Sequence, residues 1–207
     1  MSLTVVIIAL TTGVSWYAWR DASLLNRLIM SPRHIKNHNE YHRLLTSGFV
    51  HSDWNHLIFN MLTLYFFGEA IENTLIAIFG QTLGWVCYLA FYLLGIVASD
   101  VPSYLKNRNN YGYAALGASG GVSSLLFGFI LIAPLNDVCL YFMICIPGFI
   151  FGLLYLGYSY IQAKRGMDNI GHDAHLYGSL FGLVFMAILV PSAVPNFISQ
   201  IGSYSIF

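Results

Sequence analysis

The chain has 207 residues, of which 57% are hydrophobic and only 9% are charged, and its mean hydropathy is +0.66. So few charged side chains cannot cover a water-soluble protein of this size, and the composition predicts an integral membrane protein. Nine basic and nine acidic residues give a net charge of zero. The basic residues form no dense patch, which argues against nucleic acid as a partner.

Hydrophobic runs recur along the chain at lengths near the ~20 residues that cross ~30 Å of hydrocarbon. They predict an all-α, polytopic membrane protein with about six spans, near residues 3–19, 54–67, 75–98, 115–133, 138–161 and 175–190. The first run lacks the charged leader and cleavage site of a signal peptide and is expected to remain in the mature protein. No segment suits a separate soluble domain, so residues 1–207 are expected to form a single transmembrane domain.

The longest polar break covers about residues 20–53, where charged residues alternate with leucines, and it is expected to lie at the membrane interface. Shorter breaks are expected at residues 69–74, 100–111, 134–137 and 164–173. In the first of these, Glu69 and Glu72 would mark the end of the second span. Short connections make successive helices antiparallel neighbours. The second, fourth and sixth spans then begin on the same side of the membrane.

The three cysteines lie in apolar runs at unrelated spacings: Cys87, Cys139 and Cys145. This pattern fits neither a metal site nor a disulfide framework. The cysteines are therefore expected to be buried packing residues.

Four polar residues lie near the N-terminal ends of the second, fourth and sixth predicted spans. His56 and Asn60 are four residues apart, which places them on one helix face. Ser119 opens the fourth span within a glycine-rich stretch, and His175 opens the sixth. Polar groups inside a membrane are costly, so each is a functional hypothesis until packing explains it. We expect the four side chains to meet in one pocket.

Small residues recur on two of these spans, at Gly120, Ser124 and Gly128 on the fourth and at Gly178 and Gly182 on the sixth. Stripes of small residues allow two helix backbones to approach closely. The fourth and sixth helices are therefore expected to touch. This contact would bring Ser119 within hydrogen-bond reach of His175, as a nucleophile and its base require.

These residue types predict acyl-transfer chemistry with a serine nucleophile. His175 would take the Ser119 proton during attack and later return it to the leaving amine. The side chains of His56 and Asn60, with the Ser119 backbone N–H, would stabilise the oxyanion. Asp173 is two residues before His175 and would point to another helix face. A Ser–His dyad is therefore the simplest arrangement.

Each of these residues also has a structural interpretation. A serine in a glycine-rich membrane helix is usually a packing residue, and this interpretation is assigned to Ser123, Ser124 and Ser179. His175 alone could cap a helix, and His56 with Asn60 could hold helices together. The combination at matched span positions favours the catalytic interpretation.

Three motifs resemble those of rhomboid intramembrane serine proteases: His51-x4-His56-x3-Asn60, Gly117-Ala-Ser119-Gly120 and Ala174-His175-x2-Gly178-x3-Gly182. The similarity covers about residues 40–191 and includes Tyr41-His42-Arg43 in the first loop. It implies a six-helix rhomboid-like bundle in which Ser119 is the nucleophile and His175 the base, with no cofactor or metal. By the same resemblance the oxyanion donors would be His56 and Asn60, and supporting residues would be His51, Gly117, Gly120, Gly178 and Gly182.

The resemblance implies cleavage of transmembrane protein substrates within the lipid bilayer, near the membrane surface, with the fifth helix and a cap loop as a gate. The compact chain suggests a bacterial inner (cytoplasmic) membrane enzyme. Two positions depart from the family pattern, because His42 and Ser123 stand where many members have an aromatic residue. The Lys and Arg residues favour a cytoplasmic catalytic side, whereas bacterial members usually place that side outside.

Two other classes of function fit parts of the sequence. The first is a catalytically inactive rhomboid-like protein that binds membrane clients, a class that usually lacks the serine or the histidine. The second is a transporter or metal channel that uses His51, His56, His172 and His175. No HExxH motif or paired acidic ligand accompanies these histidines.

Overall fold

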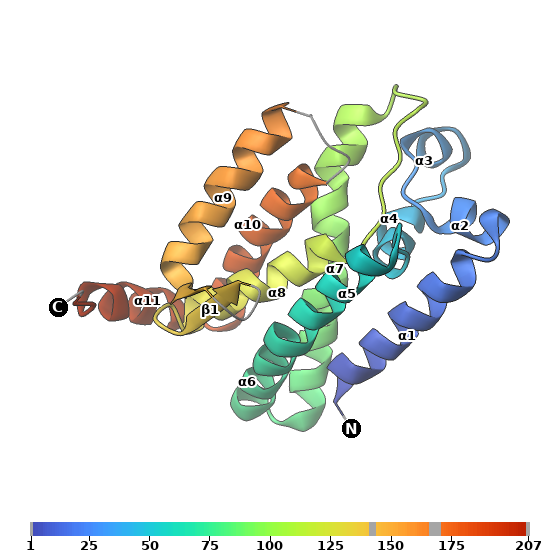
Figure 1. The fold of residues 1–207 in the computed structure, drawn as a ribbon. Coiled ribbons are helices and arrows are strands. Elements are labelled where there is room, and N and C mark those ends of the chain that lie inside the picture. Colours follow the sequence, from blue (N-terminus) through green and yellow to red (C-terminus); the bar gives the residue numbers. More distant parts are fainter. Residues whose placement is uncertain (1, 141–143, 166–170, 206–207) are drawn as a thin grey trace.

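The computed structural model describes residues 2–140, 144–165 and 171–205, which fold into a bundle of helices (Figure 1). In chain order the elements are α1 (Leu3–Ala18), α2 (Ala22–Leu28), α3 (Pro32–His38), α4 (Arg43–Thr46), η1 (Ser47–Phe49), α5 (Trp54–Thr63), η2 (Leu64–Gly68), α6 (Glu69–Phe79), α7 (Gln81–Asn107), α8 (Ser119–Ile132), β1 (Asp137–Leu140), β2 (Ile144–Pro147), α9 (Gly148–Arg165), α10 (His172–Leu189) and α11 (Ala193–Gly202).

The long first loop folds into short helices at one end of α1. Asp21 caps the N-terminus of α2, because its side chain accepts hydrogen bonds from two backbone N–H groups. Arg43 is only 4% exposed, and its guanidinium donates to the backbone carbonyls of Asn26, at 2.6 Å, and Ile29, at 3.0 Å. A buried cation on carbonyl oxygens holds this loop against the bundle.

The predicted break at residues 69–74 is wrong. Helices α5 and α6 are joined by the π-helical turn η2 into one continuous helical segment, and the chain turns only at Gly80, where φ is 78°. Glycine reaches positive φ at little steric cost. Glu69 and Glu72 therefore lie within a helix and do not end a span.

Glu72 lies within the helical segment and serves as the hydrogen-bond acceptor for the N-terminal residues of α1. Its carboxylate accepts hydrogen bonds from the N–H groups of Leu3 and Thr4, at 2.8 and 2.9 Å, and from the Thr4 hydroxyl. The Ser2 hydroxyl and the Trp85 indole N–H donate to it as well. These contacts satisfy backbone donors that a helix N-terminus otherwise leaves without partners.

The predicted fifth span at residues 138–161 is also wrong. Its first part forms a two-stranded antiparallel hairpin, β1 with β2, and the helix α9 begins only at Gly148. Residues 141–143 lie outside the described part of the chain. Cys139 faces Cys145 across the hairpin in a disulfide, and both are exposed. The expectation of buried, unpaired packing cysteines fails for this pair because strand register, which spacing does not reveal, places them opposite each other.

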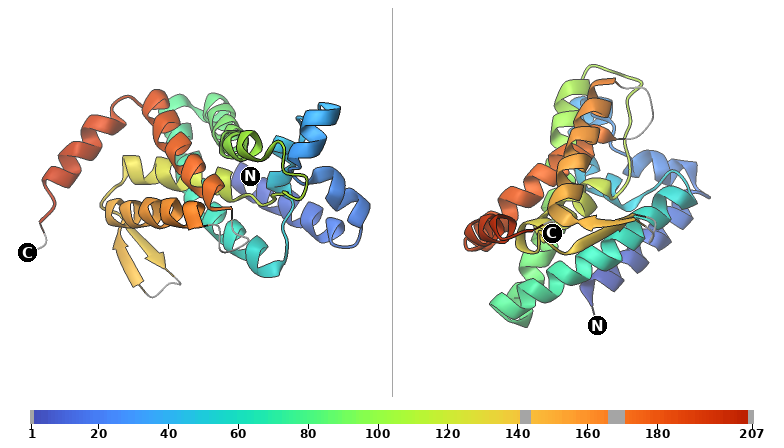
Figure 2. Two further views of the ribbon diagram at one scale, coloured as in Figure 1. Left: turned by 90° about the horizontal axis from the view of Figure 1, so that it is seen from above. Right: turned by 60° about the vertical axis from the view of Figure 1, so that its left-hand side comes forward.

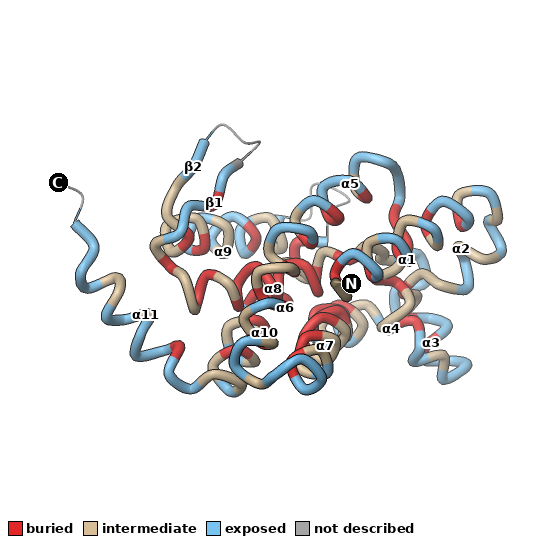
Figure 3. The backbone as a smooth tube through the Cα atoms, turned by 90° about the horizontal axis from the view of Figure 1, so that it is seen from below, coloured by how far each residue is buried: buried red, intermediate tan, exposed pale blue. Residues whose placement is uncertain are grey.

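Helix α8 packs against both α7 and α10 at the centre of the bundle, where the buried positions concentrate (Figure 3). Its 14 residues measure about 21 Å along the axis, less than the ~30 Å of hydrocarbon. Most of its side chains contact protein and not lipid. A buried helix does not need to match the thickness of the bilayer.

By length and hydropathy, three helical segments in the described part of the chain can span a membrane: Trp54–Phe79, Gln81–Asn107 and His172–Leu189. Helices α1 and α8 are apolar but shorter. The predicted count of six is therefore not reached by this criterion. Seen from above, α11 extends away from the bundle at the C-terminal end (Figure 2).

Candidate active site

A cavity of about 650 Å³ opens between the N-terminal ends of α5, α8 and α10. All four polar residues singled out in the sequence line it: His56, Asn60, Ser119 and His175. Ser119 is the first residue of α8, and His175 lies in the first turn of α10. The folded chain therefore gathers side chains that are far apart in the sequence at one hollow site.

The position of α10 against α8 is set by direct contact of their backbones. A Cβ atom at Gly178 would collide with the backbone carbonyl of Gly120, and one at Gly182 with the carbonyl of Ser124. The predicted contact between the two small-residue stripes is thereby confirmed. Gly120 directly follows Ser119, and Gly178 lies one turn after His175, so this contact fixes the helix ends that carry the two side chains relative to each other.

On α5, Asp53 caps the helix by accepting a hydrogen bond from the His56 N–H, at 3.0 Å. The Asn60 side chain donates to the His56 carbonyl one turn earlier, at 2.9 Å. The Ser52 hydroxyl donates to Asp53 and lies 3.1 Å from His56 Nδ1. With the Ser52 proton directed to Asp53, Nδ1 is the donor of that second contact. A neutral imidazole has only one N–H group, and here that group is at Nδ1. Nε2, the nitrogen that lies beside Gly117, therefore carries a proton only when the ring is charged.

Gly117 is the residue at which the chain turns into the site. Its φ is 120°, and a Cβ atom there would lie 2.6 Å from Cε1 and 2.7 Å from Nε2 of His56. Both facts exclude a side chain at this position. The Gly117 N–H donates to the carbonyl of Ser47 at 2.9 Å, which ties this turn to the first loop.

His51 supports the site from behind as a fully buried residue. Its Nε2 accepts a hydrogen bond from the Ala118 N–H at 3.2 Å, so its Nδ1 carries the proton and donates to Ser15 Oγ at 3.1 Å. Burial, and secondarily the neighbouring His56, lowers the pKa of His51 to about 3. The neutral ring that this hydrogen-bond chain needs is therefore the stable form at neutral pH.

Asp100 is a second buried group that sequence analysis did not identify. It lines the same cavity from α7 and accepts a hydrogen bond from the Ser47 hydroxyl at 2.8 Å. Because the Ser47 carbonyl holds Gly117, this pair braces the turn before Ser119. Nothing in the local pattern of α7 separates this aspartate from a residue at a helix end.

Asp173, two residues before His175, is paired with a residue of α7. Its carboxylate forms a salt bridge with Lys106 of α7 at 2.9 Å. Among the described residues, no group of three or more His, Cys, Asp and Glu side chains has the arrangement of a metal site.

An aromatic ring that sequence analysis did not single out stacks on His175. The Tyr155 ring of α9 has its centroid 5.9 Å from that of His175, with 28° between the planes. The Tyr155 hydroxyl lies 2.9 Å from the Ser123 hydroxyl on α8. The aromatic residue that α8 lacks at position 123 is thus replaced by one from a neighbouring helix. Aromatic residues are so frequent on α9 that no sequence signal distinguishes this one.

A family model described as the Rhomboid domain matches residues 38–192, about three quarters of the chain. This chain belongs to the rhomboid family. The match contains every residue of the site described above except Ser15, which contacts His51 from α1.

The rhomboid relatives come from plants and bacteria. The chain is 29% identical over 185 residues to the RHOMBOID-like protein 12, mitochondrial, of Arabidopsis thaliana, covering 84% of this chain and 54% of that protein. It is 30% identical over 174 residues to the Rhomboid-like protein 11, chloroplastic, of the same plant, covering 76% and 56%. It is 28% identical over 160 residues to the Rhomboid protease GlpG of Haemophilus influenzae, covering 76% and 74%.

The chain spans about half the length of the two plant relatives. Rhomboid membership and the apolar helices establish an integral membrane protein. The expectation of a bacterial inner membrane is not supported, because organellar plant proteins stand among the relatives. Because organellar proteins are among the relatives, membership of the family does not by itself decide the membrane.

Proposed function

We propose that this chain is an intramembrane serine protease that cleaves transmembrane protein substrates through Ser119 and His175. The observation that supports the proposal most is that Ser119 and His175 line one cavity, at helix ends that are joined by the backbone contact between Gly178 and Gly120. Nucleophilic catalysis requires a serine and an imidazole within reach of each other, and both side chains line this one cavity. Membership of a family that includes a protein named as a protease adds to this support.

The reaction would proceed in two steps. Ser119 Oγ attacks the scissile carbonyl carbon while His175 takes the hydroxyl proton, and the resulting oxyanion collapses to an acyl-enzyme as the proton passes to the leaving amine. Water then attacks the ester with His175 again as the base, releasing the new carboxyl group and restoring the serine. No step needs a metal or a cofactor.

The oxyanion would be stabilised by donors on two elements. The Ser119 N–H is at the N-terminus of α8, where helix N–H groups have no partner within the helix. Asn60 and His56 contribute side chains from α5 to the lining of the same cavity, and His56 would donate from Nε2 only when its ring is protonated. Removal of one such donor lowers kcat by ~10²–10³-fold in serine proteases.

Activity-based labelling tests this proposal without a known substrate. The detergent-purified wild type should react with a fluorophosphonate, whereas Ser119→Ala and His175→Ala should not. Ser124→Ala is the matched control, because the Ser124 hydroxyl on the same helix donates to the Gly121 carbonyl and should not be needed for labelling. Equal labelling of the wild type and Ser119→Ala would instead favour a client-binding protein without catalysis. Cleavage of a single-span model substrate by the wild type then establishes the reaction.

A further inference from the structure

The tyrosine that stacks on the candidate base belongs to neither of the helices that carry the dyad. Tyr155 is on α9, whereas Ser119 is on α8 and His175 on α10. The ring planes of Tyr155 and His175 are 28° apart with centroids 5.9 Å apart, an offset arrangement that aromatic rings favour. Tyr155 also lines the cavity. Contact with one face of the imidazole limits how far that ring can rotate.

The other end of the same side chain is attached to the helix of the nucleophile. The Tyr155 hydroxyl is in hydrogen-bond contact with Ser123 Oγ at 2.9 Å. Ser123 is 3% exposed and lies four residues after Ser119, on the same face of α8. A single side chain therefore connects the helix face of the serine with the ring of the base.

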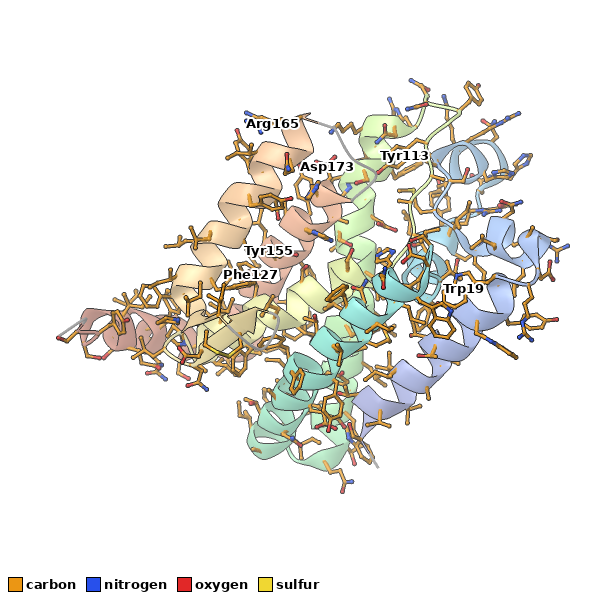
Figure 4. The ribbon with its side chains drawn as sticks, in the orientation of Figure 1. Trp19, Tyr113, Phe127, Tyr155, Arg165 and Asp173 are labelled. Carbon is orange, nitrogen blue, oxygen red and sulfur yellow. A yellow bond between two sulfur atoms is a disulfide. The ribbon has the colours of Figure 1, made fainter. Side chains whose placement is uncertain are left out.

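Two further rings limit the movement of Tyr155. Phe127, one turn beyond Ser123 on α8, has its centroid 5.6 Å from that of Tyr155, and Phe151 on α9 lies at 5.7 Å. Figure 4 shows Tyr155 and Phe127 together at the junction of α9 and α8. A ring that packs against three other rings and is hydrogen-bonded at its tip has few rotamers open to it.

We propose that Tyr155 is a positioning residue for His175, and that Ser123 sets its place by holding the phenol hydroxyl. This inference rests on the proposed function, because it assigns Tyr155 a role only through the imidazole that acts as base. The Tyr155 ring fixes the plane of the His175 imidazole. The contact of the Tyr155 hydroxyl with Ser123 fixes that ring relative to the face of α8 that carries Ser119. Neither side chain is assigned a direct contact with the substrate.

The test is a set of variants measured by the rate of fluorophosphonate labelling. Tyr155→Leu removes the ring and should slow labelling ~2- to 10-fold, the range that corresponds to one aromatic contact. Tyr155→Phe retains the ring, and Ser123→Ala retains the phenol, so each should slow labelling less than Tyr155→Leu does. Because both remove the same hydrogen bond, their combination should be no slower than the stronger single variant.

Tyr160→Leu is the matched control, since Tyr160 is on the same helix but 50% exposed. It should label at the wild-type rate. The pH at which labelling reaches half its maximum should shift in Tyr155→Leu and stay constant in Tyr160→Leu, a difference that a purely structural role would not produce. Melting temperatures in detergent identify variants that lose the fold, and Tyr155→Phe with Ser123→Ala still decides the question if Tyr155→Leu is unstable.

The outcomes separate this inference from the proposed function. If wild type and Ser119→Ala label equally, the protease proposal fails. If wild type labels specifically but Tyr155→Leu matches it in rate and pH profile, the role of Tyr155 is refuted and the protease proposal stands. Additive losses in Ser123→Ala and Tyr155→Phe would also refute the coupling through the shared hydrogen bond.

Discussion

His51 Nε2 accepts the backbone N–H of Ala118, the residue directly before Ser119. The contact needs an unprotonated Nε2, and burial, which lowers the pKa of His51 to about 3, keeps the ring neutral at neutral pH. A histidine far from Ser119 in the sequence thus fixes the start of the helix that carries the candidate nucleophile.

Acid should therefore destabilise the protein through His51. Its folded pKa is below the unfolded value near 6.5, so the unfolded state binds more protons between these values and stability falls as the pH falls. The loss should reach up to about 1.4 kcal/mol per pH unit. Thermal unfolding in detergent between pH 7 and pH 4 measures it.

A non-titrating variant provides the comparison for this prediction. His51→Gln should be less stable than wild type at pH 7, and this difference should shrink toward pH 4. His38→Gln changes an exposed histidine in the first loop and should leave the pH profile unaltered. An equal pH dependence in wild type and His51→Gln would contradict the assignment.

The backbone contact between α8 and α10 predicts a strong sensitivity to a single methyl group. Gly178→Ala places Cβ against the Gly120 carbonyl and should cost about 1–3 kcal/mol of stability, as overpacking does. Gly157→Ala is the matched control, because a Cβ atom at that α9 position meets nothing within 4 Å. It should be neutral or stabilising, since alanine favours a helix over glycine by about 1 kcal/mol. Equal melting temperatures for the two variants would rule out the close approach.

Glu72 should be more important for stability than its sequence neighbour Glu69. Glu72→Ala removes the acceptor for the first N–H groups of α1 and should cost more than about 2 kcal/mol, because buried donors lose a charged partner. Glu69→Ala, on the same helix, should cost less. The unfolding of both variants, monitored by circular dichroism, measures the two losses of stability. A larger loss in Glu69→Ala than in Glu72→Ala would contradict this prediction.

The disulfide can be tested by counting reactive thiols. In denaturant without reductant, alkylation should modify only Cys87, whereas after reduction it should modify all three cysteines. Mass spectrometry reads the number directly. In Cys87→Ser, no cysteine should be modified before reduction and two should be modified after it. Three modified cysteines before reduction would show that the hairpin is unpaired in the purified protein.

Sequence patterns singled out four side chains that line one cavity, whereas they misplaced several helix boundaries. Ser119, His175, His56 and Asn60 were found because a polar group in an apolar run is conspicuous, and stripes of small residues indicated which helices touch. Glu72 was misassigned by the same criterion, because a buried carboxylate that caps another helix resembles a polar break. Only the tertiary fold distinguishes these two situations.

The contacts that sequence patterns missed all depend on long-range geometry. Cys139 and Cys145 pair through strand register, and Asp100 meets Ser47 across two elements. Tyr155 is one of several aromatic residues on α9, and its stack on His175 depends on how that helix is rotated. None of these relationships has a local signature in composition or spacing.

The glycine contacts also restrict how the bundle can move. Where Gly178 and Gly182 meet α8, backbone lies against backbone, and no side chain is available to rearrange, so the two helices move as one body. Helix α9 contacts that body through side chains, including Phe127 and Tyr155, which can repack. Fluctuations of the bundle are therefore expected to displace α9 relative to α8 and α10. A displacement of α9 that widens the cavity would also move the Tyr155 ring away from His175.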